Sequence, residues 1–430
     1  MLRWSQFLRK LFKDRSANAV VVTGFTVLTM VGGAGLATDT IQWTLWKRQL
    51  QRMSDSAALA GAFSVARGNS ANSAAQSEIN RYNIITLSGS PTIESPPSTG
   101  AYSGNSKAVR VVLNSTRPLP FSSMFMSAAP NMRASATAAA VGFGVYCVIA
   151  LENTTANGIT FQGSSTTNLG CGAMTNSQSV SGNSQNTASV YAGGSSSITA
   201  SPISAVGIVP ASNNFASGTV LNSYAIAQTD PYSSIGLPTG YSCSGQLQVG
   251  SNQNKTVQNN GGGVQCYRGM DLKGNVTFDP GTYVIDGSTG GSLNVGAGAT
   301  VNCSACTFIL TTSSSDKTTV AVATMNGNST WNVLAPNTGT YAGIQMYQDR
   351  SAILTAGSNS VSGNSTTSTS GAYYFPSQGL TFIGNSSLNT KCIQIVARQV
   401  TFTGNTTIQN VCDPDGASKA IAGTQIRLVD

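Results

Sequence analysis

The side chains of this chain that are best suited to covalent chemistry are eight cysteines: Cys147, Cys171, Cys243, Cys266, Cys303, Cys306, Cys392 and Cys412. An even number is typical of disulfides formed in an oxidising compartment. Three consecutive pairs are separated by 24, 23 and 20 residues, and we predict disulfides between Cys147 and Cys171, Cys243 and Cys266, and Cys392 and Cys412. Cys303 and Cys306 have redox-motif spacing, but ATVNCSACTFIL predicts a strand, so we expect this pair to be structural, either bonded or reduced.

Catalysis by other side chains is restricted because the chain has no histidine, which excludes Ser/His/Asp and Cys/His mechanisms and most transition-metal sites. The remaining candidates for carboxylate chemistry are Asp271, Asp279, Asp286 and Asp349, with Arg268 and Arg350. They lie in turn-like segments such as FDPGTY and YQDRS, where Asp commonly caps a turn. We therefore expect no enzymatic activity, no metal and no cofactor.

The amino terminus predicts a membrane anchor. Residues 16–38 contain no charge and follow five basic side chains: Arg3, Arg9, Lys10, Lys13 and Arg15. About 20 apolar or small residues span a bilayer, and flanking basic residues favour the cytoplasmic side. We predict a cytoplasmic leader at 1–15, a transmembrane helix at 16–38 and export of the residues after Asp39. A cleaved signal peptide is the alternative, but its apolar core would be shorter.

The net charge of +8 does not indicate a nucleic-acid partner, because it is unevenly distributed. Residues 1–150 contain 14 Lys and Arg against 5 Asp and Glu, whereas residues 151–430 contain 9 against 10. The basic excess is the topology signal plus a cluster of Lys47, Arg48 and Arg52, which could contact anionic lipid head groups. We expect the membrane, and not nucleic acid, to be a partner.

The helix is predicted to continue over residues 39–68, because apolar and small residues recur at spacings of three and four: Trp43, Trp46, Leu50, Met53, Ala57 and Ala60. This stripe could bind a partner helix or pack on its own domain, and both alternatives are open. If it binds a partner, replacing Leu50 and Met53 with Asp should abolish partner capture and leave the exported domains folded.

Residues 69–144 predict a small α+β domain. Ala74–Tyr82 has a helical pattern, KAVRVVLNS alternates as a strand does, PFSSMFM predicts a short helix, and MRASATAAAVGFGV predicts a second strand.

Residues 145–430 are rich in Gly, Asn, Ser and Thr, and a Gly-Asn dipeptide recurs after short β-type segments, at Gly182, Gly274, Gly327, Gly363, Gly384 and Gly404. The last three are 21 and 20 residues apart, a period typical of solenoids. We predict a right-handed parallel β-helix, in which Asn adopts the left-handed conformation at corners and equivalent Asn side chains form ladders. The cysteine separations are close to this period, so the pairs would link adjacent repeats. A β-sandwich is the alternative.

An aromatic group lies near the end of this region: Tyr341, Tyr347, Tyr373, Tyr374 and Phe375. Exposed tyrosines would suit contacts with a surface glycan, whereas buried ones would stack inside the repeats. We favour burial.

Taken together, the basic leader, the anchor ending in GLATD, and the segments LQRMSDSAALAGAF, RVVLNSTRPLPFSSMF and MRASATAAAV resemble the amino-terminal region of TadE/TadG-like proteins of the Flp (tight adherence) pilus assembly system. The resemblance covers residues 10–145. It implies an inner-membrane protein with its amino terminus in the cytoplasm and its bulk in the periplasm or on the cell surface. Such a protein would contact other pilus-assembly or pilin-like proteins.

The same resemblance bears on processing. Prepilin peptidase substrates usually keep Glu at the fifth mature position, but cleavage after Gly24 would place Phe25 first and Thr29 fifth. We expect the leader to be retained, as in TadG-like members. The alternative function is an anchored β-helical adhesin or glycan-binding protein, and a glycan-active enzyme ranks last.

Overall fold

The computed structural model consists of two compact units: unit 1, residues 1–141 with 426–430, and unit 2, residues 142–425. The residues that it describes are 15–82, 85–259, 261–355, 358–362, 369–384, 387–404, 407–410 and 421–429, with side chains described for all of these except 15–20, 387–392 and 407–410. The carboxyl-terminal residues 426–430 were predicted to belong to the large β region. They lie instead in unit 1, where the Val429 N–H donates to the carbonyl of Thr137.

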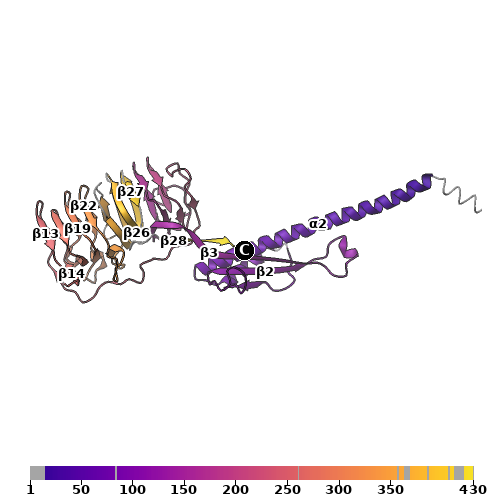
Figure 1. Cartoon of the computed structure of the whole chain (residues 1–430), viewed down its shortest axis with the longest axis horizontal. Coiled ribbons are helices and arrows are strands. Elements are labelled where there is room, and N and C mark those ends of the chain that lie inside the picture. The colour runs from indigo at the N-terminus through magenta and orange to yellow at the C-terminus, as the bar shows by residue number, and fades with distance from the viewer. Residues whose placement is uncertain are drawn as a thin grey trace, which may run out of the picture. The chain divides into compact units, whose positions relative to one another are not determined.

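Unit 1 is organised around α2 (Arg15–Ala66), one helix of 52 residues that is about 78 Å long at 1.5 Å per residue (Figure 1). No proline interrupts it, and it ends just before Gly68, whose φ of 76° favours glycine. The first half is long and apolar enough to span a membrane, and no side chain from Val21 to Thr38 is buried.

Three hydroxyl groups in this first half are satisfied within the helix. Thr26, Thr29 and Thr38 each donate to the carbonyl four residues earlier, on Val22, Phe25 and Ala34. A hydrocarbon environment offers no water to such groups, so internal hydrogen bonds make these residues compatible with lipid.

The rest of unit 1 is an α+β domain. Its elements are α3 (Ala71–Arg81), β1 (Thr92–Glu94), β2 (Ala108–Thr116), the 3₁₀ turn η1 (Ser122–Met124) and β3 (Asn131–Ala150). The three strands pair antiparallel in the order β1–β2–β3, and α3 begins at Ser70, which caps the Ser73 N–H. The predicted helix, short helix and two strands are present within a few residues. β1 was not predicted, because three residues carry too little periodicity.

The described strands of unit 2 pair in parallel along three rows, each strand beside one from the next repeat. The first row is β11 (Cys243–Ser244), β14 (Val264–Tyr267), β17 (Gly281–Asp286), β20 (Cys306–Thr311), β23 (Ile344–Gln348), β25 (Thr369–Gly384), β26 (Ser387–Gly404), β3, β6 (Gly172–Thr175), β9 (Ile203–Ala205) and β10 (Leu221–Asn222).

The second row is β12 (Leu247–Val249), β15 (Met270–Leu272), β18 (Leu293–Val295), β21 (Ala323–Met325), β24 (Asn359–Ser362), β25, β26, β4 (Ile159–Phe161) and β7 (Val190–Ala192). The third contains β13 (Asn254–Val257), β16 (Asn275–Phe278), β19 (Thr300–Cys303) and β22 (Thr330–Val333), and also β27 (Thr407–Asn410), β5 (Thr166–Asn168) and β8 (Ser197–Thr199). Two 3₁₀ turns, η2 (Gly287–Thr289) and η3 (Lys317–Thr319), and the strand β28 (Ile421–Leu428) complete the chain. Parallel pairing in these residues is incompatible with the hairpins of the β-sandwich alternative.

The order of strands in these rows differs from their order in the chain. The chain enters at β3 in the middle of the first row and proceeds outward to β10. The connector, residues 223–242, then leads to β11 at the opposite end, and the chain returns strand by strand to β26 (Figure 1). There β26 pairs with β3 and β4, with Ile395 opposite Val148 and Val400 opposite Ile159. We call this junction the seam.

Both faces of the first row are buried over its inner strands, such as β20, β23 and β6, whereas β10, β11 and β14 near its ends are partly exposed. One face, which includes Val148, Phe308 and Ile395, belongs to the main core, and the other, which includes Ile149 and Val396, belongs to a second apolar cluster with the connector packed against it. Burial on both faces explains why strands such as CTFILT read as continuous apolar runs and do not alternate.

Equivalent side chains stack across repeats. The rings of Phe382, Phe402 and Phe161 are separated by 5.5 and 5.1 Å and are nearly parallel, so this stack crosses the seam. The predicted Asn ladders occur at Asn275, which donates to Asn254. The expected left-handed corner is found at Asn328, with a φ of 65°. Asn183 and Asn275, which follow Gly182 and Gly274, do not adopt it, and Asn275 is the first residue of the extended strand β16.

The seam also contains an ion pair. Glu152, whose side chain is fully buried, lies 3.0 Å from Arg398 and accepts hydrogen bonds from the Thr154 N–H and hydroxyl. Burial opposes ionisation of Glu152, but the bonds from Arg398 and Thr154 outweigh it and hold its pKa below the ordinary glutamate value.

We predict that Arg398→Ala destabilises the seam by about 1–3 kcal/mol at neutral pH, because it leaves a buried carboxylate without its cation. Since the pKa of Glu152 is lowered by folding, its stabilising contribution is present above the ordinary glutamate pKa and is lost as the pH falls through the folded value. Hydrogen exchange of residues 146–162 and 393–404 measures the effect. The exposed pair Lys273–Asp271, with atoms 2.9 Å apart, provides the control, because Lys273→Ala should change exchange little. Equal protection in wild type and Arg398→Ala would contradict the prediction.

Candidate functional site

The predicted interaction stripe on α2 is divided between two environments. Leu50, Met53 and Ala57 are buried within unit 1, where α2 packs against α3 and β2. The Ser54 hydroxyl donates to the carbonyl of Val111 at 2.9 Å in the same contact. This part of the stripe therefore packs on its own domain, as one of the two alternatives proposed. The expectation that Asp at Leu50 and Met53 would leave the domain folded is wrong, because these side chains are in its core.

The membrane-proximal end of the stripe is partly open. Trp43 is 36% exposed and lies under the ammonium group of Lys47, whereas Trp46 is half-buried and lies 4.7 Å from the guanidinium of Arg117. Ala60, at the distal end, is half-buried.

A second exposed surface lies on another side of α2. Ile41 is 61% exposed and Leu45 is 48% exposed, one turn apart, and Arg48 and Arg52 continue the same line. The exposed face of the outer half, which we call the open face, therefore consists of Ile41, Leu45, Arg48 and Arg52.

At the boundary between the two halves, Asp39 is fixed by the connection from β2 to β3. Its carboxylate accepts hydrogen bonds from the Phe121 N–H, at 2.9 Å, and from the N–H and hydroxyl of Ser122. Burial opposes the charge of Asp39, but these hydrogen bonds lower its pKa below the ordinary value. The first charge after the apolar segment is thus bound by protein groups.

The helix α2 coincides with the part of the chain that matches a protein family. Residues 17–67 match the family described as putative Flp pilus-assembly TadE/G-like. The matched part begins in the exposed apolar half of α2 and ends with the helix itself. The resemblance of the amino-terminal region is therefore confirmed for this segment. No curated protein matches the chain.

The candidate carboxylates are occupied by structural hydrogen bonds. Asp286 accepts from the N–H and hydroxyl groups of Ser288 and Ser313, on its own and the next repeat, and these bonds outweigh burial and lower its pKa. Asp349 accepts from the Thr311 hydroxyl at 2.7 Å and caps the turn at Ser351.

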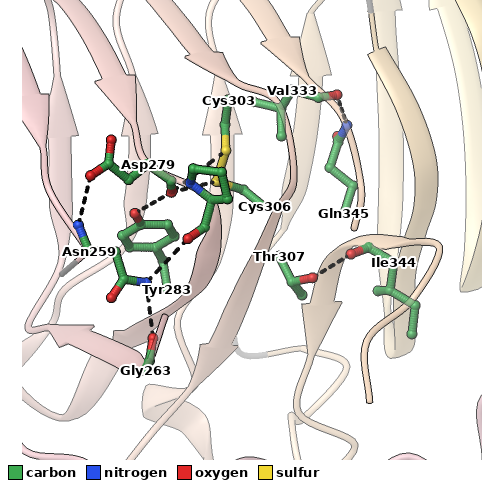
Figure 2. Close-up of a disulfide and its surroundings, with 11 residues drawn as sticks. Asn259, Gly263, Asp279, Tyr283, Cys303, Cys306, Thr307, Val333, Ile344 and Gln345 are labelled. Carbon is green, nitrogen blue, oxygen red and sulfur yellow. Dashed lines mark hydrogen bonds between the residues drawn. A yellow bond between two sulfur atoms is a disulfide. The ribbon is translucent and has the colours of Figure 1, made fainter. Parts of the chain in front are cut away.

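Two further carboxylates act in the same way. Asp279 accepts from the N–H of Asn259 at 3.1 Å, as Figure 2 shows, and Asp271 forms an ion pair with Lys273. Arg268 is exposed. Asp279, Asp286 and Asp349 therefore cap or join turns, whereas Asp271 lies in the strand β15 and pairs with Lys273 just after it.

Arg350 and the tyrosines hold the connector in place. The Arg350 guanidinium donates to the carbonyls of Tyr232 and Ile235 and lies 3.6 Å from the carboxylate of Asp230. That carboxylate accepts from the hydroxyl of Tyr374.

The other members of the aromatic group are buried in the same way. The Tyr347 and Tyr341 hydroxyls donate to connector carbonyls, and Tyr373 and Phe375 lie in the main core. Their burial agrees with the favoured alternative.

The described residues contain three disulfides: Cys147–Cys171, Cys243–Cys266 and Cys303–Cys306. Cys243 and Cys266 are register partners on neighbouring parallel strands, with Cα atoms 4.4 Å apart, as expected for a link between repeats. Cys303 and Cys306 close the turn between β19 and β20, beside the Asp279 carbonyl that accepts from Tyr283 (Figure 2). Cys412 and the side chain of Cys392 lie outside the described residues.

Sequence reasoning missed the residues that join distant parts of the chain. Asp39, Glu152 and Asp230 are each embedded among Ser, Thr or Pro and resemble ordinary turn residues locally. The one available signal was their rarity, since only 9% of the chain is charged.

For the disulfides, non-reducing peptide mapping should find the three described links and a fourth between Cys392 and Cys412, because β26 and β27 pair as neighbouring repeats. A link from Cys412 to any cysteine other than Cys392 would contradict this stacking.

For the stripe, Leu50→Ala should lower the unfolding free energy of unit 1 by about 2–5 kcal/mol, since the side chain is fully buried. Limited proteolysis of residues 71–141 in the detergent-solubilised full chain reports the change. Leu45→Ala is the matched control on the same helix and should change stability by about 0.5 kcal/mol or less. Equal protease resistance of the two variants would place Leu50 outside the core.

Proposed function

We propose that this protein is a TadG-like, membrane-anchored component of Flp pilus assembly or surface adherence, and that it acts by protein–protein contact and not by catalysis. The observation that carries the proposal is the coincidence of the TadE/G-like segment, residues 17–67, with α2. One half of this helix offers apolar surface to a membrane, and the other half forms the core of an α+β domain. The helix therefore holds a folded domain at a fixed distance from the bilayer.

The proposed topology places the amino terminus in the cytoplasm of a bacterium, α2 in the inner membrane and the remaining residues in the periplasm or at the cell surface. The basic leader supports this orientation, and the disulfides of unit 2 support an oxidising compartment. We propose that the leader is retained, because Thr29 stands where a processed prepilin usually has Glu.

The proposed architecture of unit 2 is a right-handed parallel β-helix. Its support is the in-register parallel pairing of successive repeats in three rows, with stacked Phe rings and Asn ladders between equivalent positions. Such a body is stiff, because each repeat is hydrogen-bonded to its neighbours on both sides.

The proposed partner surface is the open face of α2. Ile41 and Leu45 continue the exposed apolar surface of the preceding half, so a second spanning helix packed against α2 would meet them beyond the bilayer. Arg48 and Arg52 would attract acidic groups on that partner. Trp43, two positions from both Ile41 and Leu45, lies on the opposite side of the helix and is not part of this surface.

A second candidate function, an anchored adhesin or glycan-binding protein, is favoured by one observation. Unit 2 has a groove of about 600 Å³ beside the connector, lined in part by Thr239, Thr282, Thr338 and Thr340. Hydroxyl groups of this kind can bind sugars, and Tyr341 of the aromatic group also lines the groove.

Deletion of the gene should abolish surface pili, and the wild-type gene should restore them. Leu45→Asp should restore them poorly, because loss of an apolar contact of about 1–2 kcal/mol weakens partner binding about tenfold. Pilus counts by electron microscopy, with immunoblotting of membranes for protein level, provide the measurement.

The matched control is Val180→Asp, which changes a side chain that is 68% exposed in unit 2 and should restore pili fully. Normal pili with impaired attachment in the deletion strain would favour the adhesin. Unchanged pili and unchanged attachment would exclude both functions.

A further inference from the structure

The connection from β2 to β3 exposes large apolar side chains. Residues 118–132, PLPFSSMFMSAAPNM, contain no charge. Met124, the last residue of η1, and Phe125, which follows it, are each 76% exposed. The next residue, Met126, is 49% exposed. We call these three residues the apolar tip. Consecutive exposed apolar residues at the end of a loop are unusual in water and require an explanation.

This connection is fastened to α2. The ring of Phe121 packs so closely on Gly35 that a Cβ atom added there would lie 2.4 Å from it. Asp39 binds the N–H groups of Phe121 and Ser122, as described above. Met126 lines a groove of about 250 Å³ with Leu36 and other residues of the helix. The position of the apolar tip along α2 is therefore defined by packing and by hydrogen bonds.

That position is within the apolar half of the helix. Gly35 precedes Asp39 by four residues, which is about 6 Å along the axis at 1.5 Å per residue. Residues 16–38 contain no charge, so lipid that surrounds the last turn of this segment must meet Phe121 beside it. The β2–β3 connection thus extends to the depth of the bilayer surface.

The surroundings of the apolar tip have the composition of a membrane interface. Arg117 and Arg133 flank the uncharged residues, and Arg133 is exposed. The Arg117 guanidinium stacks 4.7 Å from the ring of Trp46, and the Lys47 ammonium lies 5.1 Å from the ring of Trp43. Trp, Lys and Arg are enriched at head-group level, where indole rings and cations meet lipid phosphates.

From these observations we propose that the apolar tip inserts into the outer leaflet of the membrane that α2 spans, as a second and shallow attachment beside the helix. The occupant of this surface is phospholipid, with acyl chains around Met124 and Phe125 and anionic head groups at Arg117 and Arg133. The expected depth is roughly 5–10 Å below the head groups, as for other interfacial apolar segments. This inference rests on the proposed membrane anchoring.

The attachment has a mechanical consequence. A single spanning helix can rotate and tilt in a bilayer, whereas a helix with a lateral apolar contact is restrained in both movements. Insertion of the apolar tip would therefore fix which side of α2 faces a partner helix, and would hold the α+β domain of unit 1 against the membrane surface.

The test uses the full chain in liposomes of phosphatidylethanolamine and phosphatidylglycerol, with a nitroxide attached to Phe125→Cys. Electron paramagnetic resonance measures collisions with oxygen, which concentrates in lipid, and with a water-soluble nickel complex. We expect the ratio of oxygen to nickel accessibility at position 125 to be several-fold higher than at Ala101→Cys. Residue 101 is the matched control, since it is exposed and precedes β2, whereas the connection leaves the other end of that strand.

Three results would overturn the proposal or its basis in different ways. A ratio at position 125 equal to that at Ala101→Cys would show that the apolar tip lies in water. Low accessibility to both oxygen and the nickel complex would show that the apolar tip is covered by protein, such as a second copy of the chain. Leu28→Cys distinguishes failure of the anchor: if its label is also in water, α2 does not span the membrane and the proposed function fails. Labelling of the unsubstituted protein must be negligible, and hydrogen exchange of residues 108–116 should match wild type in each variant.

Discussion

The continuity of α2 is the constraint on which the functional part of this structure depends. A helix without a break relates every side chain to every other by a fixed rise and a fixed rotation, so the depth of one residue in a membrane sets the depth of all. Leu50, Met53 and Ala57 are buried against the α+β domain of unit 1. Their burial therefore also determines which face of the first half of α2 is turned toward the side of that domain. It also determines that the β2–β3 connection meets the helix at Gly35 and Asp39. A kink between the two halves would remove each of these relations, and the absence of proline preserves them.

In unit 2 the corresponding constraint is that each parallel strand inside a row needs a neighbour on both sides. The chain begins this unit in the middle of the first row, so the strand β3 has one edge unpaired until β26 returns to it. Backbone pairing, the Phe161–Phe402 stack and the Glu152–Arg398 ion pair then act at the same seam. The connector has to cross the row because the chain must pass from β10 to β11, and its crossing covers the outer apolar face. The strand order, the buried core and the path of the connector thus all follow from the pairing of β26 with β3 and β4.

Much of this could be predicted from the sequence, for reasons that are local. Spacings of three and four residues along α2 predict a helix, and alternating strands with a period of 20 to 21 residues predict parallel stacking. The spacing of Cys243 and Cys266 matches one repeat, which is why their disulfide could be predicted. Periodicity identifies an apolar stripe but not its partner, so the burial of Leu50 within unit 1 could not be predicted. The seam joins residues about 246 positions apart, and such a pairing leaves no local pattern.

In the described residues, the surroundings of the buried charged groups bear on function more directly than the fold does. Asp39, Glu152, Asp286 and Asp349 are the buried carboxylates, and each accepts at least two hydrogen bonds from N–H or hydroxyl groups. In a chain with so few charges, a buried anion is stable only where such donors converge, and their effect is to lower the pKa of Asp39, Glu152 and Asp286. A general acid needs the opposite shift, produced by burial without donors, and a mobile proton. Asp39, Glu152 and Asp286 are thus held as anions that fasten one segment to another, a use that suits the contact role proposed for this protein.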